Sequence, residues 1–482
     1  MVFAHPPAAR PWRVSRRAGG MVPGEVGLGA LRLPRAACRG YRPETPARSL
    51  DGGHPGRRKH GVRGVDDRDR HLGGDALVVD ARRGAGHRLF RRVFDHAEPI
   101  GQRGEKRIMS SALALALLSL SQPTHHLFVG TYTGPNSQGI YRIDFDAAKG
   151  TLGEPALAAK MTNPSFLAIH PDGKKLYAVG EVGESGKRKG GAVAAFSLSP
   201  KGELAPINDQ STVGGGPCHV TVDPSGKVVV IANYGGGSVA SYKVRADGGI
   251  EEHASFIQHK GGSVNKQRQE TPHAHSVNTD PAGKFVYAAD LGLDKVLIYS
   301  LDAGTGQLRP ANPPHASVAP GAGPRHFCFH PSGKFAFVIN ELGNTITAFR
   351  HDAATGALTE YQTISTLPEG HKGPSYTAEV VAHPSGKFIY GSNRRGDSIA
   401  AFRVDEATGK LTLAGFASEG VKEPRNFIVD PTGKWLLVGN QNADSIIVFA
   451  IDQATGVPKP TGVSVKVGKP VCLRLLPIGG VK

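Results

Sequence analysis

A five-residue string of His or Asp, Pro, any residue, Gly and Lys occurs six times between residues 170 and 434. Successive copies are 53, 57, 50, 53 and 47 residues apart. Proline fixes the φ that the second position of a tight turn requires, and glycine supplies the positive φ needed later in the turn. Each copy therefore predicts a turn, and the spacing predicts repeated units. The copies begin at His170, Asp223, Asp280, His330, His383 and Asp430.

A second turn string, close to Asp-x-x-Thr-Gly-x-Leu, alternates with the first. Clear copies span 146–152, 302–308, 352–358, 405–411 and 452–457, and degenerate copies lie near 200–204 and 247–250. Alternating apolar segments such as Phe335–Ile339 flank the turns and predict strands. Four short antiparallel strands per unit of about 50 residues are typical of a β-propeller blade.

The two ends of the repeat region complete a seventh unit. Pro470–Pro477 has the phase of a first strand, and Leu127–Thr131 has the phase of a second strand with no first strand before it. Joining them closes the ring and removes the exposed sheet edges. We therefore predict an all-β fold, a seven-bladed β-propeller over residues 127–482 closed by a C-terminal strand and preceded by a disordered N-terminal extension.

Most of the positive charge lies before the repeats. Of a formal net charge of +17, residues 1–108 contribute +12, with 21 Arg and 2 Lys against 11 acidic residues. This stretch has no sustained apolar period, which predicts a disordered Arg-rich extension or a start assigned upstream of the true one. Because the repeat region carries only +5 and stacking aromatics are scarce in the extension, we expect no nucleic-acid partner.

Residues 109–126 form a signal-like apolar segment and a linker. The run from Met109 to Ser121 ends in small residues, as the core of a secretory signal does. Translation from Met109 would favour a periplasmic or secreted protein. No apolar run reaches the about 18 residues that a membrane-spanning helix needs, so we expect no membrane partner. The four cysteines form no C-x-x-C pair, and the oligomeric state stays open.

The turn strings also locate the functional end of the propeller. The turns between first and second strands lie at one rim of the propeller. The first strands therefore begin, and the second strands end, at the opposite rim. Polar positions there vary among repeats and are rich in His, Arg and Glu, as expected where a repeat protein carries its site. The candidates for catalysis are His275, Arg325, Glu341 and Arg394. The candidates for a supporting, substrate-binding role are His219, His326, Glu379, Asn393 and Arg425.

Several short strings in the repeat region occur together in a characteristic order. They are Val129–Thr133, Val230–Tyr234, His273–Ser276, Gly323–His326, Val338–Leu342, Ser365–Pro368 and Ser392–Arg394. In this order they resemble the lactonase family of seven-bladed propellers, and the resemblance covers residues 127–476. The family includes the propeller-type 6-phosphogluconolactonase and a fungal carboxy-cis,cis-muconate cyclase.

The resemblance implies a cytoplasmic, cofactor-independent enzyme that acts on a small anionic lactone. In the muconate enzyme the proposed site is a His, an Arg, a Glu and a second Arg, which correspond by motif to His275, Arg325, Glu341 and Arg394. We expect no metal, because the His, Asp and Glu residues show no metal-ligand spacing.

The residue types fit lactone hydrolysis. His275 or Glu341 could take a proton from water, Arg325 could stabilise the oxyanion, and Arg394 could bind the anionic group. The favoured substrate is 6-phospho-D-glucono-1,5-lactone, in the pentose phosphate pathway. The alternatives are a muconate-type lactonizing enzyme, another lactone hydrolase, and a non-catalytic propeller that binds a partner at its rim.

Overall fold

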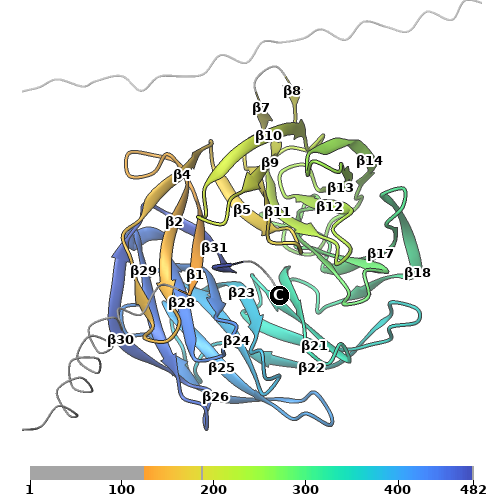
Figure 1. Ribbon diagram of the computed structural model, residues 1–482. Helices are drawn as coiled ribbons and strands as arrows, with labels where there is room; N and C mark the ends of the chain where they lie inside the picture. The colour runs from red at the N-terminus through yellow and green to blue at the C-terminus, as the bar shows by residue number, and fades with distance from the viewer. Residues whose placement is uncertain (1–123, 186–187, 480–482) are drawn as a thin grey trace, which may run out of the picture. The chain divides into compact units, whose positions relative to one another are not determined.

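The computed structural model describes residues 124–185 and 188–479. The predicted Arg-rich extension and nearly all of the signal-like segment therefore lie outside the described residues. Seven antiparallel sheets are arranged as blades around a central channel (Figure 1). The predicted seven-bladed propeller is confirmed. Among the described residues, no helix is long and apolar enough to cross a membrane.

Each blade contains a first strand next to the channel, followed outward by second, third and fourth strands. The first strands are β5 (Pro164–Ile169), β11 (Pro217–Val222), β15 (Ala274–Thr279), β19 (Pro324–Phe329), β23 (Tyr376–Ala382), β27 (Pro424–Val429) and β31 (Pro470–Pro477). The second strands are β6 (Lys175–Gly180), β12 (Val228–Asn233), β16 (Phe285–Asp290), β20 (Phe335–Asn340), β24 (Phe388–Arg394), β28 (Trp435–Asn440) and β1 (His125–Thr131).

The outer strands follow the same order around the ring. The third strands are β9 (Ala192–Leu198), β13 (Ser238–Val244), β17 (Lys295–Asp302), β21 (Thr345–His351), β25 (Ser398–Val404), β29 (Ser445–Ile451) and β2 (Gly139–Asp146). The fourth strands are β10 (Leu204–Ser211), β14 (Ile250–Gln258), β18 (Gln307–Ser317), β22 (Leu358–Ser365), β26 (Leu411–Ala417), β30 (Pro458–Lys466) and, in two pieces, β3 (Thr151–Leu152) and β4 (Ala156–Lys160). A small hairpin, β7 (Glu184–Ser185) and β8 (Arg188–Lys189), and a 3-10 turn, η1 (Gln441–Ala443), complete the elements.

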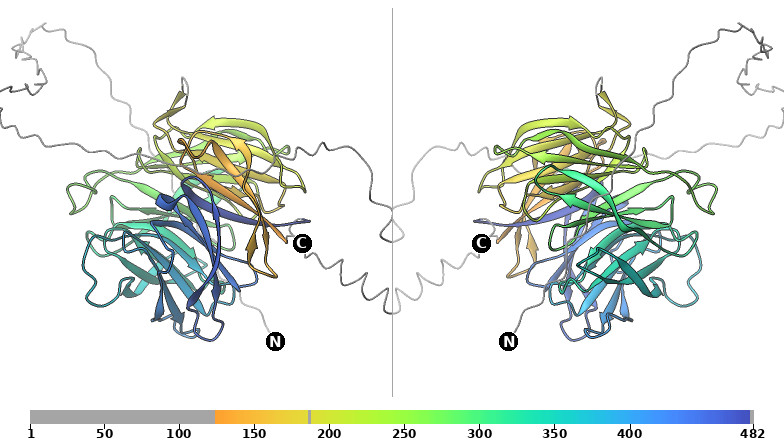
Figure 2. Two further views of the ribbon diagram at one scale, coloured as in Figure 1. Left: turned by 90° about the vertical axis from the view of Figure 1, so that its left-hand side faces the viewer. Right: turned by 90° about the vertical axis from the view of Figure 1, so that its right-hand side faces the viewer.

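The ring is closed by pairing the two ends of the described chain. Strand β31 lies antiparallel to β1, with Leu475 opposite Leu127 and Leu473 opposite Val129. This confirms the predicted closure, which leaves no unpaired blade edge between the last and first repeats. Figures 1 and 2 show that β31 ends on the face turned toward the viewer in Figure 1.

The cores lie between neighbouring blades and tie them together. Tyr287 stacks on Phe327 of the next blade with ring centroids 5.3 Å apart, and its hydroxyl donates to the Gly356 carbonyl at 2.9 Å. Tyr177 and Tyr390 make the same bond to Gly248 and Gly456 in their neighbouring blades. A buried tyrosine whose hydroxyl is satisfied adds apolar area without leaving an unpaired polar group.

Each first strand carries a β-bulge just after its first residues. In β19, Pro324 pairs with Asn340 and His326 pairs with Ile339, which leaves Arg325 as the extra residue. The same irregularity leaves Cys218 in β11, His275 in β15 and Arg425 in β27. A bulge re-aims the side chain of its extra residue. The bulge is therefore the local device that turns these residues toward the channel mouth.

Candidate active site

A cavity of about 170 Å³ lies at the rim where the first strands begin. Its lining residues are Glu181, Cys218, Tyr234, Arg268, His275, Glu341, Arg394 and Arg425. The structure thus brings His275, Glu341, Arg394 and Arg425 together, although they come from four blades. Arg325 lies behind the lining, 1 % exposed and hydrogen-bonded to Glu341.

Three arginines converge on the Glu341 carboxylate in this cavity, here called the mouth cavity. Its Oε2 is 3.0 Å from Arg325 Nε and 2.8 Å from Arg394 Nη2, and its Oε1 is 2.6 Å from Arg268 Nη2. Burial by itself would raise the pKa of Glu341, but the arginines outweigh burial and lower it to about 2. Glu341 is therefore an ionised structural anion and a poor proton acceptor at neutral pH.

The three guanidiniums around Glu341 lie at different depths. The exposed fraction of the side chain is 2 % for Arg325, 12 % for Arg394 and 35 % for Arg268. Burial, together with Arg425 and Arg394, lowers the pKa of Arg325 to about 9, so it stays positively charged at neutral pH. The cavity therefore presents positive charge from its solvent side to its floor.

Two of these arginines keep N–H groups free for a ligand. Arg325 uses Nε for Glu341 and Nη1 for the Ala378 carbonyl at 2.8 Å. Its Nη2 has no hydrogen-bond partner among the described residues. The Nε of Arg394 is buried and likewise has no hydrogen-bond partner among the described residues. Unpartnered guanidinium N–H groups are suited to an oxyanion ligand.

His275 is a neutral imidazole at the inner wall of the mouth cavity. It is 5 % exposed, and its ring lies 5.2 Å from Tyr234 and 5.3 Å from His326 between centroids. Burial lowers the pKa of His275 well below 6.5, and Arg325, His326 and Arg425 lower it further. Because a neutral imidazole keeps a free lone pair, His275 can accept a proton.

The neighbouring Cys218 does not have the properties of a nucleophile. Its Sγ lies 3.2 Å from the His275 carbonyl and 3.7 Å from His275 Nδ1. Burial raises the pKa of the Cys218 thiol well above its usual value. Since the thiolate is the reactive form, Cys218 stays a protonated lining residue.

Arg425 is fixed on the far side of the cavity by an aromatic contact. Its guanidinium lies 5.3 Å from the Tyr132 ring centroid, and its Nη2 donates to Tyr132 Oη at 2.9 Å. Tyr132 Oη in turn donates to Glu181 Oε2 at 2.9 Å. This chain joins β27 to the loops after β1 and β6 and orients Arg425 as a fourth cation of the site.

Arg268 was not predicted from the sequence, because it belongs to the loop between β14 and β15. Gln269 anchors this loop by donating to Leu291 O at 2.8 Å and to Asp294 Oδ1 at 2.7 Å. The same Asp294 oxygen accepts from Gly323 N at 2.7 Å, two residues before Arg325. Asp294 therefore holds together the segments that carry two arginines of the site.

Glu181 and Tyr234 were also missed as candidates, although the sequence held a signal for them. Both stand seven residues after a turn lysine, as Glu341 and Arg394 do. This register marks the end of the second strand at the mouth. Cys218 shares the bulge register of His275 and Arg325 in the same way.

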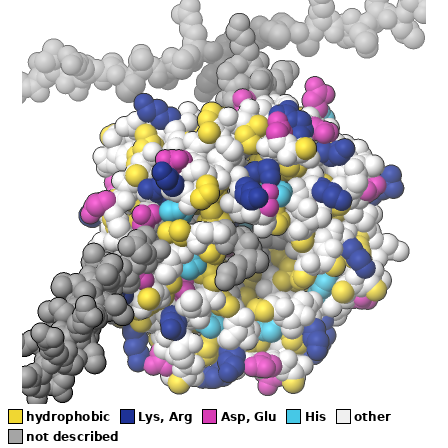
Figure 3. Space-filling view, viewed as in Figure 1, with side chains coloured by type: hydrophobic (Ala, Val, Ile, Leu, Met, Phe, Trp, Pro, Cys, Tyr) yellow, Lys and Arg dark blue, Asp and Glu magenta, His cyan; other side chains and the backbone are white. Residues whose placement is uncertain are grey.

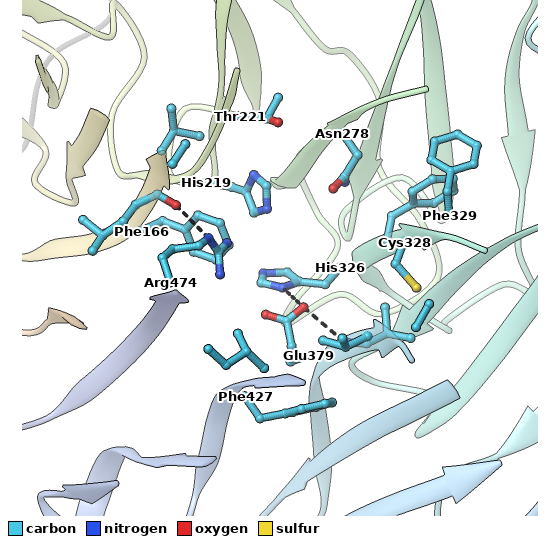
Figure 4. A pocket seen from close by; sticks show the side chains of 18 of the residues that line it. Phe166, His219, Thr221, Asn278, His326, Cys328, Phe329, Glu379, Phe427 and Arg474 are labelled. Atoms are coloured by element: carbon cyan, nitrogen blue, oxygen red, sulfur yellow. Dashed lines mark hydrogen bonds and ion pairs between the residues drawn. The ribbon is translucent and has the colours of Figure 1, made fainter. Parts of the chain in front are cut away.

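Three predicted supporting residues lie deeper than the mouth cavity. His219, His326 and Glu379 line a second, larger cavity of about 590 Å³ within the channel (Figure 4). His326 alone of the three makes a ring contact with His275, edge to face with 5.3 Å between ring centroids. The three residues thus line a neighbouring cavity and not the candidate site itself.

The interpretation of Asn393 as a substrate-binding residue is not retained. Its side chain is fully buried and bonds Thr366 O at 2.8 Å and Ser398 Oγ at 3.1 Å. Asn233 and Asn440 make equivalent bonds in their own blades. The asparagine therefore connects the end of β24 to β25 and to the linker that follows β22 of the preceding blade, and it lines neither cavity. Among the described residues, no group of His, Cys, Asp and Glu side chains could hold a metal ion.

The fold and the mouth cavity together define a class: a closed seven-bladed propeller with an arginine-rich pocket at one channel mouth. More specifically, the chain belongs to the family Lactonase, 7-bladed beta-propeller, whose model matches residues 126–475.

Similar proteins from other organisms carry lactonase names. The chain is 37 % identical over 302 residues to a 6-phosphogluconolactonase of Bacillus subtilis, covering 62 % of this chain and 84 % of that protein. It is 34 % identical over 309 residues to a 6-phosphogluconolactonase of Formosa agariphila, covering 63 % and 86 %. The structure of a periplasmic gluconolactonase of Pseudomonas aeruginosa matches with a TM-score of 0.69 and 34 % identity, covering 73 % and 98 %.

Proposed function

We propose that this protein hydrolyses a phosphorylated sugar lactone, 6-phospho-D-glucono-1,5-lactone, to 6-phosphogluconate. The charge of the mouth cavity carries the proposal. Four guanidiniums, Arg268, Arg325, Arg394 and Arg425, surround two carboxylates, Glu181 and Glu341, which gives a formal charge of +2. A phosphate monoester carries about −1.5 to −2 at neutral pH. The names of the Bacillus and Formosa relatives support the same substrate, which would place the protein in the pentose phosphate pathway.

The reaction begins with water activated by His275. As the water oxygen attacks the lactone carbonyl carbon, His275 takes one proton from the water. His275 is the neutral base of the cavity, whereas the arginines lower the pKa of Glu341 and make it a poor proton acceptor. The negative charge of the approaching substrate offsets the arginine charges that depress the pKa of His275. Collapse of the tetrahedral intermediate breaks the ring C–O bond, and the His275 proton passes to the leaving ring oxygen.

The depth of the arginines suggests how the charges of substrate and intermediate are divided. Arg325 is the most buried and has a free Nη2, so it is suited to the oxyanion, whose stabilisation is strongest where water is excluded. Arg394 and Arg268 lie nearer to solvent. They are suited to the phosphate group, which tolerates partial hydration and forms charge-assisted bonds with guanidiniums.

An unphosphorylated sugar lactone is the second candidate substrate, because the Pseudomonas neighbour is named a periplasmic gluconolactonase. The same His275 and Arg325 would serve that reaction. The two substrates differ in whether Arg268 and Arg394 have a charged group to bind.

The test is a comparison of two lactones with the purified full chain. Hydrolysis of 6-phosphogluconolactone and of glucono-1,5-lactone is followed above the spontaneous rate of each. We expect kcat/KM to be about 100-fold higher for the phosphorylated lactone, since two charge-assisted hydrogen bonds contribute about 1.5–3 kcal/mol each before the cost of desolvation. Equal kcat/KM values would favour gluconolactone as the substrate. No acceleration of either lactone would overturn the lactonase proposal in favour of another lactone or a binding role.

A further inference from the structure

The larger cavity, here called the lower chamber, has polar features that the proposed reaction does not use. It is lined by first-strand residues from Phe166 and His326 down to Pro331, which belongs to a turn string at the other rim. Figure 3 shows the face of the propeller at that rim, hollowed near its centre. The lower chamber thus extends away from the mouth cavity, with His326 at the boundary between the two.

Arg474 on β31 supplies a preorganised cation in the lower chamber. Its guanidinium stacks on the Phe166 ring at 4.5 Å from the centroid. Its Nε donates to Leu167 O at 3.0 Å and its Nη1 to Leu473 O at 2.7 Å. Among the described residues, no carboxylate forms an ion pair with Arg474 and its Nη2 has no hydrogen-bond partner. A partly buried cation without a counter-ion is costly, which indicates that a ligand completes it.

Two histidines face Arg474 across the chamber. Figure 4 shows the side chains of Arg474, His219 and His326 pointing toward one another, and the two imidazole rings lie 5.3 Å apart between centroids. Val277 N donates to His219 Nδ1 at 3.4 Å, which places the proton of neutral His219 on Nε2. His219 is therefore a hydrogen-bond donor toward the chamber.

His326 adds an unsatisfied polar atom at the same point. It is 4 % exposed, its Nδ1 lies 2.9 Å from Glu379 Oε1, and its Nε2 is buried with no partner among the described residues. If Nδ1 carries the proton toward the carboxylate, Nε2 is left as an acceptor. A buried polar atom without a partner is uncommon and points to an unseen ligand.

Glu379 is the carboxylate of the chamber lining, and it does not neutralise Arg474 by contact. Its oxygens accept from Val380 N at 3.2 Å, from His326 and from the Asn426 amide. Burial raises the pKa of Glu379 to about 7. Because its oxygens are taken by these three donors, the carboxyl leaves the Arg474 guanidinium available to a ligand.

We propose that the lower chamber is a second binding site, distinct from the mouth cavity, for a phosphoryl group. Arg474 Nη2 and His219 Nε2 would donate to two phosphate oxygens, and His326 Nε2 would accept from a protonated phosphate oxygen. A carboxylate offers no such proton, which favours phosphate. The volume of about 590 Å³ admits either inorganic phosphate or a small phosphate ester. This proposal stands independently of the reaction at the mouth.

The test uses calorimetric titration of the full chain with two probes, inorganic phosphate and 6-phosphogluconate. An Arg394→Met variant weakens the mouth site, so binding in the lower chamber makes up a larger share of the phosphate binding that remains. Adding Arg474→Met, which keeps the apolar stem, should weaken this remaining binding by at least about tenfold. Arg309→Met, on the exposed part of β18, is the matched control and should change nothing.

The outcomes separate the ligand source and decide the proposal. Remaining binding of both probes supports a site open to phosphate esters, whereas binding of inorganic phosphate alone supports a site for the free ion. Unchanged affinity after Arg474→Met, or no phosphate binding once Arg394 is replaced, would overturn the proposal. If Arg474→Met does not fold, as judged by circular dichroism, Arg474→Lys is used, and it should also bind at least about tenfold more weakly because its point charge lacks the fork geometry. Hydrolysis of the lactones is measured separately, so a failure of this proposal and a failure of the proposed function can be told apart.

Discussion

The two rims of this propeller are built from the same repeat, but equivalent side chains are similar from blade to blade at one rim and differ at the other. At the turn rim the blades repeat one another: Asp223 Oδ1 accepts from Val228 N at 2.7 Å, and Asp280 and Asp430 accept equivalent bonds at the same distance. His330 and His383 instead bond the turn carbonyl of the next blade at 2.8 Å. At the mouth rim, equivalent bulge positions hold Cys218, His275, Arg325 and Arg425.

The difference follows from what the backbone needs at each rim. A tight turn has amides and carbonyls that must be satisfied, so the turn side chains are constrained in every blade. A bulge residue leaves its side chain free of the ladder. The mouth positions can therefore diverge and carry chemistry, and substitutions at the two rims should affect different properties.

The largest effect should come from Arg325 at the mouth. Arg325→Ala removes the deepest cation and leaves Glu341 with two guanidiniums, so lactone hydrolysis should fall by about 100-fold or more. Arg309→Ala is the control, and circular dichroism checks the fold. Full activity in a folded Arg325→Ala variant would remove Arg325 from the site.

Replacing His275 tests the assignment of the base. His275→Gln keeps a polar side chain but cannot take a proton from water, so kcat should fall by about 100-fold. Binding of 6-phosphogluconate, measured by calorimetry, should change little. If kcat survives in this variant, the proton is accepted elsewhere.

Arg268 tests whether the outer part of the mouth binds the phosphate. Arg268→Gln should raise KM for the phosphorylated lactone by about tenfold, the effect of losing one charge-assisted bond. The KM for glucono-1,5-lactone should stay close to that of the wild type. Equal changes for the two lactones would show that Arg268 acts only by positioning Glu341.

The buried histidines of the channel predict a pH dependence of stability. Burial lowers the pKa values of His219, His275 and His326 well below 6.5, so they stay neutral in the folded state while the unfolded chain binds protons. The contribution of these histidines should therefore be complete above about pH 6.5 and fall with acidification, by up to about 1.4 kcal/mol per pH unit for each histidine. Glu379, whose pKa burial raises to about 7, offsets about one histidine in this range, so a net loss of stability is still expected. Urea unfolding between pH 7 and pH 5 measures this. A flat profile would contradict the neutral cluster.

The smallest effect is expected at the turn rim. His383→Ala removes the bond to Gly433 O of the next blade and should lower the free energy of unfolding by about 1 kcal/mol. The kcat for lactone hydrolysis should not change. A loss of activity without a loss of stability would show that the two rims are coupled.

Asn393 and Arg268 show where prediction from the sequence stopped. Asparagine stands six residues after the turn lysine in four repeats, at Asn233, Asn340, Asn393 and Asn440. That uniformity marks a scaffold position, and comparing the repeats would have excluded Asn393 from the site. Arg268 lies in a loop outside the repeat register, so no spacing connected it with Glu341.

The number of blades, the turns, the closure of the ring and the rim that carries His275, Arg325, Glu341 and Arg394 could all be predicted from the sequence. These follow from local backbone requirements, which recur at fixed spacing. The folded structure was needed to show that three arginines share one carboxylate, that His275 is neutral, and that Arg474 faces two histidines in a separate chamber. These properties depend on distance and burial between residues of different blades, and neither is encoded in the spacing along the chain.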